Sequence, residues 1–184
     1  MKDLRTLSHV PRWAVLRVIH RQSVADHSYY VAVYASLIAK TENLMPAMHV
    51  ILLEHCLYHD IAEVFTSDIP GPVKRESCNP AHLQLYEYAG LWSRGLGFAA
   101  RDDVSPFLQS LCTICNLLDE VCYITGEIRL GNMEAEVALT FSLNRLAKVM
   151  ANIILTPETT KLIMSIIQSE NADQNLPNEP ANKE

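Results

Sequence analysis

Apolar residues recur at intervals of three and four along most of the chain, and this helical period leaves little room for strands. The chain has 6 glycines in 184 residues, and its long segments show no alternation of apolar and polar residues. We therefore predict an all-α fold, a bundle of about six to seven helices. A chain of this length is expected to form a single domain, over 1–170, with a disordered polar tail at 171–184.

Caps and prolines set the expected helix boundaries. Ser23 or Asp26 is available as the N-cap of a helix over 24–41. The stretch T-S-D-I-P-G-P-V-K at 66–74 contains two prolines and a glycine, which predict a segment without regular structure. The remaining helices are expected over 8–18, 46–65, 80–95, 104–126, 132–152 and 157–169.

Ionisable side chains interrupt an apolar stretch, L-Y-H-D-I-A-E-V-F, at 57–65. On a helical wheel, His59, Asp60 and Glu63 fall within about 100° of one another. The same arc holds apolar side chains of the preceding two turns, so the three groups are expected to face the core. Burying an unpaired carboxylate is costly, and a positive partner must therefore lie against them.

Two further ionisable groups lie on apolar faces elsewhere in the chain. His27 heads a stripe that continues through Val31 and Ile38, and Asp119 lies within a long apolar segment. Each has an ordinary explanation when taken alone. A buried histidine is usually a satisfied core residue, and Asp119 can cap a kink or pair with Arg145. The joint pattern favours a shared cation.

A divalent metal ion would compensate these groups together. His27, His59, Asp60 and Asp119 form a mixed nitrogen and oxygen set that suits Mn, Co, Fe, Zn or Mg. A bound metal neutralises the acids and lowers the pKa of a bound water from about 16 toward about 7. Glu63, one turn after His59, is then placed to orient or deprotonate that water, so we predict Glu63 and Asp60 as catalytic residues.

The order H…HD…D resembles the HD-domain superfamily of metal-dependent phosphohydrolases, which is all-α and binds its metal through those four residues. R-W at 12–13, S-V-A-D-H-S at 23–28 and H-D-I-A-E-V-F-T-S-D-I-P-G-P-V-K at 59–74 resemble the bacterial 5′-deoxyribonucleotidase branch. They resemble equally the compact phage-type dATP triphosphohydrolases of that branch. The resemblance covers roughly 8–125.

This resemblance implies phosphate contacts at Arg12 and Lys74, which are cations flanking the proposed metal ligands. Arg17 and Arg21 would enlarge the cationic rim, although surface positions are the ordinary expectation for both.

The resemblance also implies a nucleoside pocket. Trp13 corresponds to a residue that lines it, and a flat ring against a base gains about 1–3 kcal/mol. Asp68 corresponds to the group that binds the 3′-hydroxyl of the sugar, and a carboxylate is a competent acceptor. Val15 and Pro70 are expected to border the pocket beside Trp13. A core position is the ordinary alternative for Trp13.

The predicted activity is metal-dependent hydrolysis of a deoxyribonucleotide. The short interval between His27 and His59 resembles the phage-type enzymes, so we favour a dNTP triphosphohydrolase, with dATP as the candidate substrate, that releases deoxynucleoside and triphosphate. A 5′-deoxynucleotidase that dephosphorylates dNMPs is the alternative. Cyclic-nucleotide or (p)ppGpp hydrolysis and a non-catalytic nucleotide-binding protein are less favoured, the last because Glu63 and every metal ligand are present.

Composition limits the partners and the location. A net charge of −6 argues against a broad surface for nucleic acid or anionic membrane. No uncharged apolar run reaches the about 18 residues of a membrane span, and the N-terminus lacks the apolar core of a secretory signal. The five cysteines show no small-domain spacing pattern, so reduced thiols in the cytoplasm are expected. The expected partner is a small molecule. The family resemblance and the apolar faces of 80–95 and 132–152 favour a homo-oligomer.

Two other spacings resemble metal sites without completing one. His55 and His59 have H-x-x-x-H spacing, but His55 is expected on the wet edge of its helix. Cys112 and Cys115 have C-x-x-C spacing without a second pair, so they are expected to be packing groups.

Overall fold

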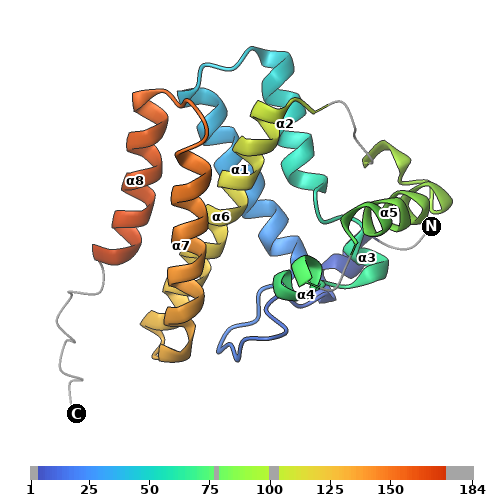
Figure 1. Ribbon diagram of the computed structural model, residues 1–184, viewed down its shortest axis with the longest axis horizontal. Helices are drawn as coiled ribbons and strands as arrows, with labels where there is room; N and C mark the ends of the chain where they lie inside the picture. The colour runs from blue at the N-terminus through green and yellow to red at the C-terminus, as the bar shows by residue number, and fades with distance from the viewer. Residues whose placement is uncertain (1–3, 77–78, 100–103, 173–184) are drawn as a thin grey trace, which may run out of the picture.

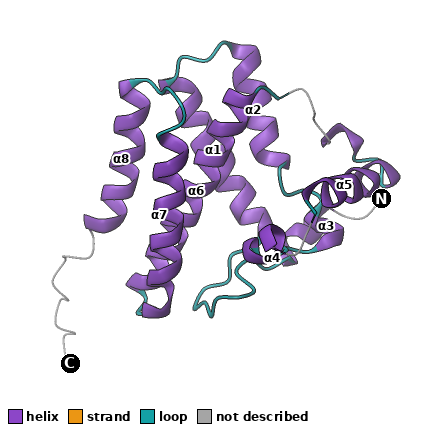
Figure 2. Cartoon of the chain, in the orientation of Figure 1, coloured by secondary structure: helices purple, strands orange, loops and turns teal. Residues whose placement is uncertain are grey.

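Helices form the regular structure of the described residues, 4–76, 79–99 and 104–172 of a computed structural model, and no strand occurs among them (Figure 2). The prediction of an all-α fold is confirmed. The only sheet-like pairing in this part of the chain is an isolated bridge between Pro11 and Ser23.

Five long helices run alongside one another and form the main body (Figure 1). They are α1 (Val24–Thr41), α2 (Pro46–Tyr58), α6 (Pro106–Arg129), α7 (Glu136–Met150) and α8 (Pro157–Ala172). Helix α6 contacts the other four, and its side chains Leu111, Ile114, Leu117 and Leu118 are fully buried. Although α6 is long and apolar enough to cross a membrane, 56% of its most apolar stretch is buried inside the protein, as expected of a core helix.

Five further helices, all but α5 short, gather at one side of this body (Figure 1). They are η1 (Leu4–His9), α3 (Glu63–Thr66), α4 (Gly71–Glu76), α5 (Pro80–Ser93) and η2 (Gly97–Ala99). Ile61, Ala62, Leu91 and Leu96 form a second, smaller core beneath them. A further short turn, η3 (Met133–Ala135), precedes α7.

The prediction of a helix over 8–18 is wrong. After η1 the chain forms an irregular loop over 10–22, in which Trp13 has a φ of 65°. Tertiary hydrogen bonds override local helix propensity here, because the backbone N–H groups of Ile19 and His20 donate to the Glu127 carboxylate on α6 at 2.6 and 2.8 Å.

The helix expected over 46–65 ends instead at Tyr58. The His59 ring bonds the Cys56 carbonyl at 2.8 Å and so competes with the helical backbone bond at that carbonyl. A tight turn follows, in which the Glu63 N–H donates to the Asp60 carbonyl at 3.0 Å before α3 begins.

The stretch at 66–74 also differs from the prediction, since α4 begins within it at Gly71. A proline in the first helical turn loses no backbone hydrogen bond, which is why Pro72 does not prevent this helix. The other long helices lie within a few residues of the expected ranges. Of the disordered tail predicted at 171–184, the first two residues belong to α8 instead, and the rest lies outside the described residues.

Candidate metal centre and substrate pocket

The N-terminus of α1 fixes the position of His27. The Ser23 hydroxyl accepts a hydrogen bond from the Asp26 N–H, and the Asp26 carboxylate accepts one from the Ser23 N–H, each at 3.1 Å. This reciprocal capping box starts the helix at Val24 and leaves His27 facing the interior with 0% exposure. Of the two N-cap candidates, Ser23 is the cap and Asp26 is the third helical residue.

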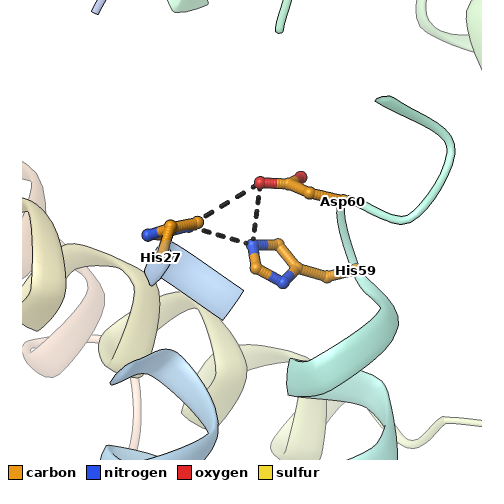
Figure 3. Close-up of side chains that lie close together, drawn as sticks. All are labelled: His27, His59 and Asp60. Carbon is orange, nitrogen blue, oxygen red and sulfur yellow. Dashed lines mark hydrogen bonds and ion pairs between the residues drawn. The ribbon is translucent and has the colours of Figure 1, made fainter. Parts of the chain in front are cut away.

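Three ligand atoms converge from α1 and from the turn that follows α2 (Figure 3). The Nε2 atoms of His27 and His59 are 3.2 Å apart. The Oδ2 atom of Asp60 lies 3.6 Å from His27 Nε2 and 3.1 Å from His59 Nε2. Two ligands bound at about 2.1 Å are separated by about 3.0 Å in octahedral and about 3.4 Å in tetrahedral geometry. The triangle therefore has the dimensions of a divalent metal site.

Hydrogen bonds on the far side of each ring aim the two histidines at this point. Asp119 Oδ2 lies 2.5 Å from His27 Nδ1, and the Cys56 carbonyl holds His59 Nδ1. Such partners fix the tautomer and orientation of metal-binding imidazoles. Asp119 is buried, as predicted, but its Oδ2 lies behind His27 rather than among the three converging atoms, so its role as a fourth ligand stays a prediction.

The pKa values of the two histidines in the cluster shift in opposite directions. Burial and the Arg12 guanidinium lower the pKa of His27 to about 4. Burial alone would also lower the pKa of His59, but the Asp60 carboxylate reverses this and raises it to about 9. Burial opposes the ionised form of Asp60, but the His59 imidazolium outweighs it and lowers the pKa of Asp60. A proton on His59 therefore occupies the place that a metal would take.

Glu63 lies beside this cluster with 3% exposure. Its Oε1 accepts a hydrogen bond from Lys74 Nζ at 3.1 Å, while its Oε2 is buried and has no partner among the described residues. Burial, followed by the Asp60 carboxylate, raises the pKa of Glu63 to about 8. A carboxyl group with a pKa near neutrality is suited to exchange protons with a nearby water.

Arg12 and Trp13 lie on the 10–22 loop rather than on a helix. Arg12 is 3.5 Å from the Asp119 carboxylate, and its guanidinium lies 5.4 Å from the centre of the Trp13 ring. The Trp13 ring stacks on Tyr123 of α6, with ring centres 5.4 Å apart and planes inclined by 13°. Trp13 is half-buried, so one part of its surface remains available to a ligand.

A cavity of about 500 Å³ opens beside these two residues. Five of the six side chains predicted to bind substrate line it, namely Arg12, Trp13, Val15, Asp68 and Pro70. Lys74, the sixth, is paired with Glu63 instead. The volume is that of a typical small-molecule site.

Part of the cavity wall comes from α7, which the sequence did not predict. Phe141, Ser142 and Arg145 line it, together with Glu120 of α6. Arg145 and Ser142 both bond the Glu120 carboxylate, at 3.3 and 2.9 Å, so the suggested pairing of Arg145 with Asp119 is wrong. Nothing local in the sequence marks this helix as part of a site.

Two other residues that contact the site were not predicted, although the sequence holds a signal for each. Gln22 bonds Arg12, Trp13 and Asp119, and it directly precedes the N-cap of α1. Tyr123 comes four residues after Asp119 and therefore shares its helical face.

The remaining candidates lie apart from the three ligand atoms. His55 is outside the cluster, and Cys112 and Cys115 are buried in the main core, as expected of packing groups. Arg17 and Arg21 are exposed, and neither lines the 500 Å³ cavity.

Comparisons with a family model and with known proteins point to the same family. The model of the YfbR-like 5′-deoxynucleotidase family matches residues 1–87. A 5′-deoxynucleotidase of Vibrio atlanticus is 32% identical over 154 residues, which cover 73% of this chain and 77% of the Vibrio protein. The 5′-deoxynucleotidase YfbR of Salmonella arizonae is 37% identical over 76 residues, or 39% of this chain and 37% of that protein.

Solved structures share the fold. The HD phosphohydrolase of cyanophage S-2L, bound to dA and one catalytic Zn²⁺ ion, superposes with a TM-score of 0.76 at 17% identity and covers 92% of this chain and 95% of that one. The PH0347 protein of Pyrococcus horikoshii gives a TM-score of 0.70 at 20% identity, over 90% of this chain and 95% of its own. At these identities the likeness shows the fold alone.

Proposed function

The chain belongs to the YfbR-like 5′-deoxynucleotidase family of HD-domain phosphohydrolases, and on that premise we propose that it removes the 5′-phosphate of 2′-deoxyribonucleoside monophosphates. One observation carries the proposal. Arg12 lies 3.5 Å from the Asp119 carboxylate, which bonds His27 of the three-ligand cluster. Arg12 also lines the cavity beside Trp13. A phosphate at the cluster and a nucleoside in the cavity would therefore both contact this residue.

The family relatives favour the monophosphate over the triphosphate. The Vibrio and Salmonella relatives are named 5′-deoxynucleotidases, so they support the dNMP alternative better than the dNTP triphosphohydrolase that the sequence favours. The cyanophage structure supports the fold but not the choice of substrate, because its sequence identity to this chain is 17%.

His27, His59 and Asp60 would hold the divalent metal, with Asp119 as the proposed fourth ligand. The metal supplies Lewis acidity at the phosphoryl group and an acidified water. Zn²⁺ suits a site of two imidazoles and a carboxylate, although the mixed set also admits Mn, Co, Fe or Mg.

The chain itself binds and orients the substrate. Arg12 would neutralise phosphate charge, and Lys74 would reach the phosphate by exchanging its bond with Glu63 for one with a phosphate oxygen. Glu63, released from Lys74, would then orient the attacking water and receive its proton. Trp13 would stack on the base, and Asp68 would accept a hydrogen bond from the 3′-hydroxyl.

Product analysis tests this proposal. The purified protein is assayed with the four common dNMPs, the matching dNTPs and the matching ribonucleotides, in Mn²⁺, Co²⁺, Zn²⁺ or Mg²⁺. We expect inorganic phosphate from dNMPs and little from ribonucleotides. Tripolyphosphate from a dNTP, with dNMPs untouched, would restore the triphosphohydrolase. Turnover of none of these substrates would favour a nucleotide-binding protein.

Glu63→Gln provides the matched variant because it preserves side-chain size but removes the proton acceptor. We expect kcat to fall by about 100-fold or more with metal affinity retained. An unchanged kcat would remove Glu63 from the mechanism. Cytoplasmic location, homo-oligomeric assembly and the absence of nucleic-acid partners stay predictions.

A further inference from the structure

Gln22 lies between the candidate metal centre and the cavity, and its side chain forms hydrogen bonds with residues of both. It is 6% exposed and directly precedes the N-cap residue of α1. Its backbone carbonyl accepts the Arg12 N–H at 3.0 Å, next to the bridge between Pro11 and Ser23. The start of the 10–22 loop is therefore tied to the start of α1 at this residue.

The Gln22 amide has three partners. Its Oε1 accepts hydrogen bonds from Arg12 at 3.0 Å and from Trp13 Nε1 at 2.9 Å. Its Nε2 donates to Asp119 Oδ2 at 2.8 Å. The orientation of the amide follows from these partners, because guanidinium and indole groups only donate and an ionised carboxylate only accepts.

Each partner has a separate task at the site. Asp119 orients the His27 ring through Nδ1, and Arg12 and Trp13 face the ligand cavity. Trp13 also has a left-handed backbone, with φ at 65°, which is unfavourable for a residue with a side chain. The indole bond to Gln22 and the stack on Tyr123 hold this conformation in place.

We propose that Gln22 is a positioning residue that sets metal affinity and nucleoside affinity together, although it contacts neither ligand. Its amide restrains Asp119, and hence His27, on one side. On the other side it restrains Trp13 and Arg12. The nucleoside half of this inference rests on the proposed function, whereas the metal half depends only on the ligand cluster.

Gln22→Met is the test variant, because methionine has nearly the same length and flexibility but neither donates to Asp119 nor accepts from Trp13. Two affinities are measured separately on the full chain. Co²⁺ binding is followed by visible absorption without any nucleoside. Binding of the tightest of the four common 2′-deoxynucleosides is followed by calorimetry without metal. We expect both dissociation constants to rise by about tenfold.

Two controls distinguish positioning from a general loss of folding. Gln109→Met removes a side-chain amide that donates to the Val104 carbonyl, away from the site, and should leave both affinities unchanged. Gln22→Glu keeps an acceptor for Arg12 and Trp13, so it should keep nucleoside affinity within about threefold of wild type.

Several results would overturn the inference. It is wrong if Gln22→Met, folded as judged by circular dichroism and thermal melting, binds Co²⁺ and nucleoside like wild type. It is also wrong if only one affinity changes, or if Gln22→Glu loses nucleoside affinity as fully as Gln22→Met. Failure of the wild-type protein to bind any nucleoside would overturn the proposed function, and the Co²⁺ measurement would still decide the metal half.

Discussion

Replacing Glu127 with alanine should open the loop that carries Trp13. The Glu127 carboxylate is 1% exposed and accepts hydrogen bonds from the N–H groups of Ile19 and His20 and from the Asn132 amide. A buried donor left unpaired costs about 1–3 kcal/mol, and some of these donors will reach water once the loop moves. We therefore expect Glu127→Ala to lower the free energy of unfolding by about 3 kcal/mol.

Two assays separate global from local effects of this change. Urea unfolding measures the free energy, and trypsin cleavage after the exposed Arg17 and Arg21 reports opening of the loop itself. We expect faster cleavage at these two sites and a rise in KM that exceeds any fall in kcat, because Trp13 lies on the same loop.

Matched variants complete the design. Glu127→Gln keeps one acceptor oxygen and should lose less stability than the alanine variant. Glu136→Ala removes an exposed carboxylate at the start of α7 and should change stability by less than about 1 kcal/mol. Unaltered stability and cleavage in Glu127→Ala would refute the reasoning that this carboxylate fixes the loop.

The other predictions concern the metal cluster and the small core. Because the pKa of His59 is raised to about 9, Co²⁺ binding at pH 7 should release about one proton, measurable by calorimetry in buffers of different protonation enthalpy; no release would contradict the protonated cluster. The same shift stabilises the metal-free protein fully below pH 6.5, and this stability is lost as pH rises through 9. Without metal, the free energy of unfolding should therefore fall by about 3 kcal/mol over that range, and the melting temperature should fall with it. A rise in melting temperature would refute this protonation of His59. Gly90→Ala would place a Cβ 2.3 Å from the Phe65 ring, so it should cost about 1–3 kcal/mol in urea unfolding, and a neutral effect would show that the ring moves freely.

Local patterns determined much of the fold and the chemical nature of the site. The helical period gave the long helices, and Ser23 marked the start of α1 because its capping bonds join residues three apart in sequence. Ionisable groups on apolar faces identified His27, His59, Asp60 and Glu63, since buried charge demands compensation wherever the chain places it. The resemblance added Arg12, Trp13 and Asp68, which the structure brings to one cavity.

Local patterns failed where distant parts of the chain compete with the backbone's own preferences. The 10–22 segment has apolar spacing suited to a helix, yet Glu127, more than a hundred positions away, accepts its N–H groups. The end of α2 at Tyr58 likewise depends on a side-chain bond from His59 to Cys56, which no periodicity shows.

The sequence alone predicted which residues would form the candidate site, because hydrophobic period, capping and charge compensation act between near neighbours. Only the tertiary structure decided how they are joined. It places Asp119 behind His27, Lys74 against Glu63, Gln22 between Asp119 and Trp13, and residues of α7 in the cavity wall. These relations depend on how helices distant in sequence pack, and packing is a property of the whole chain.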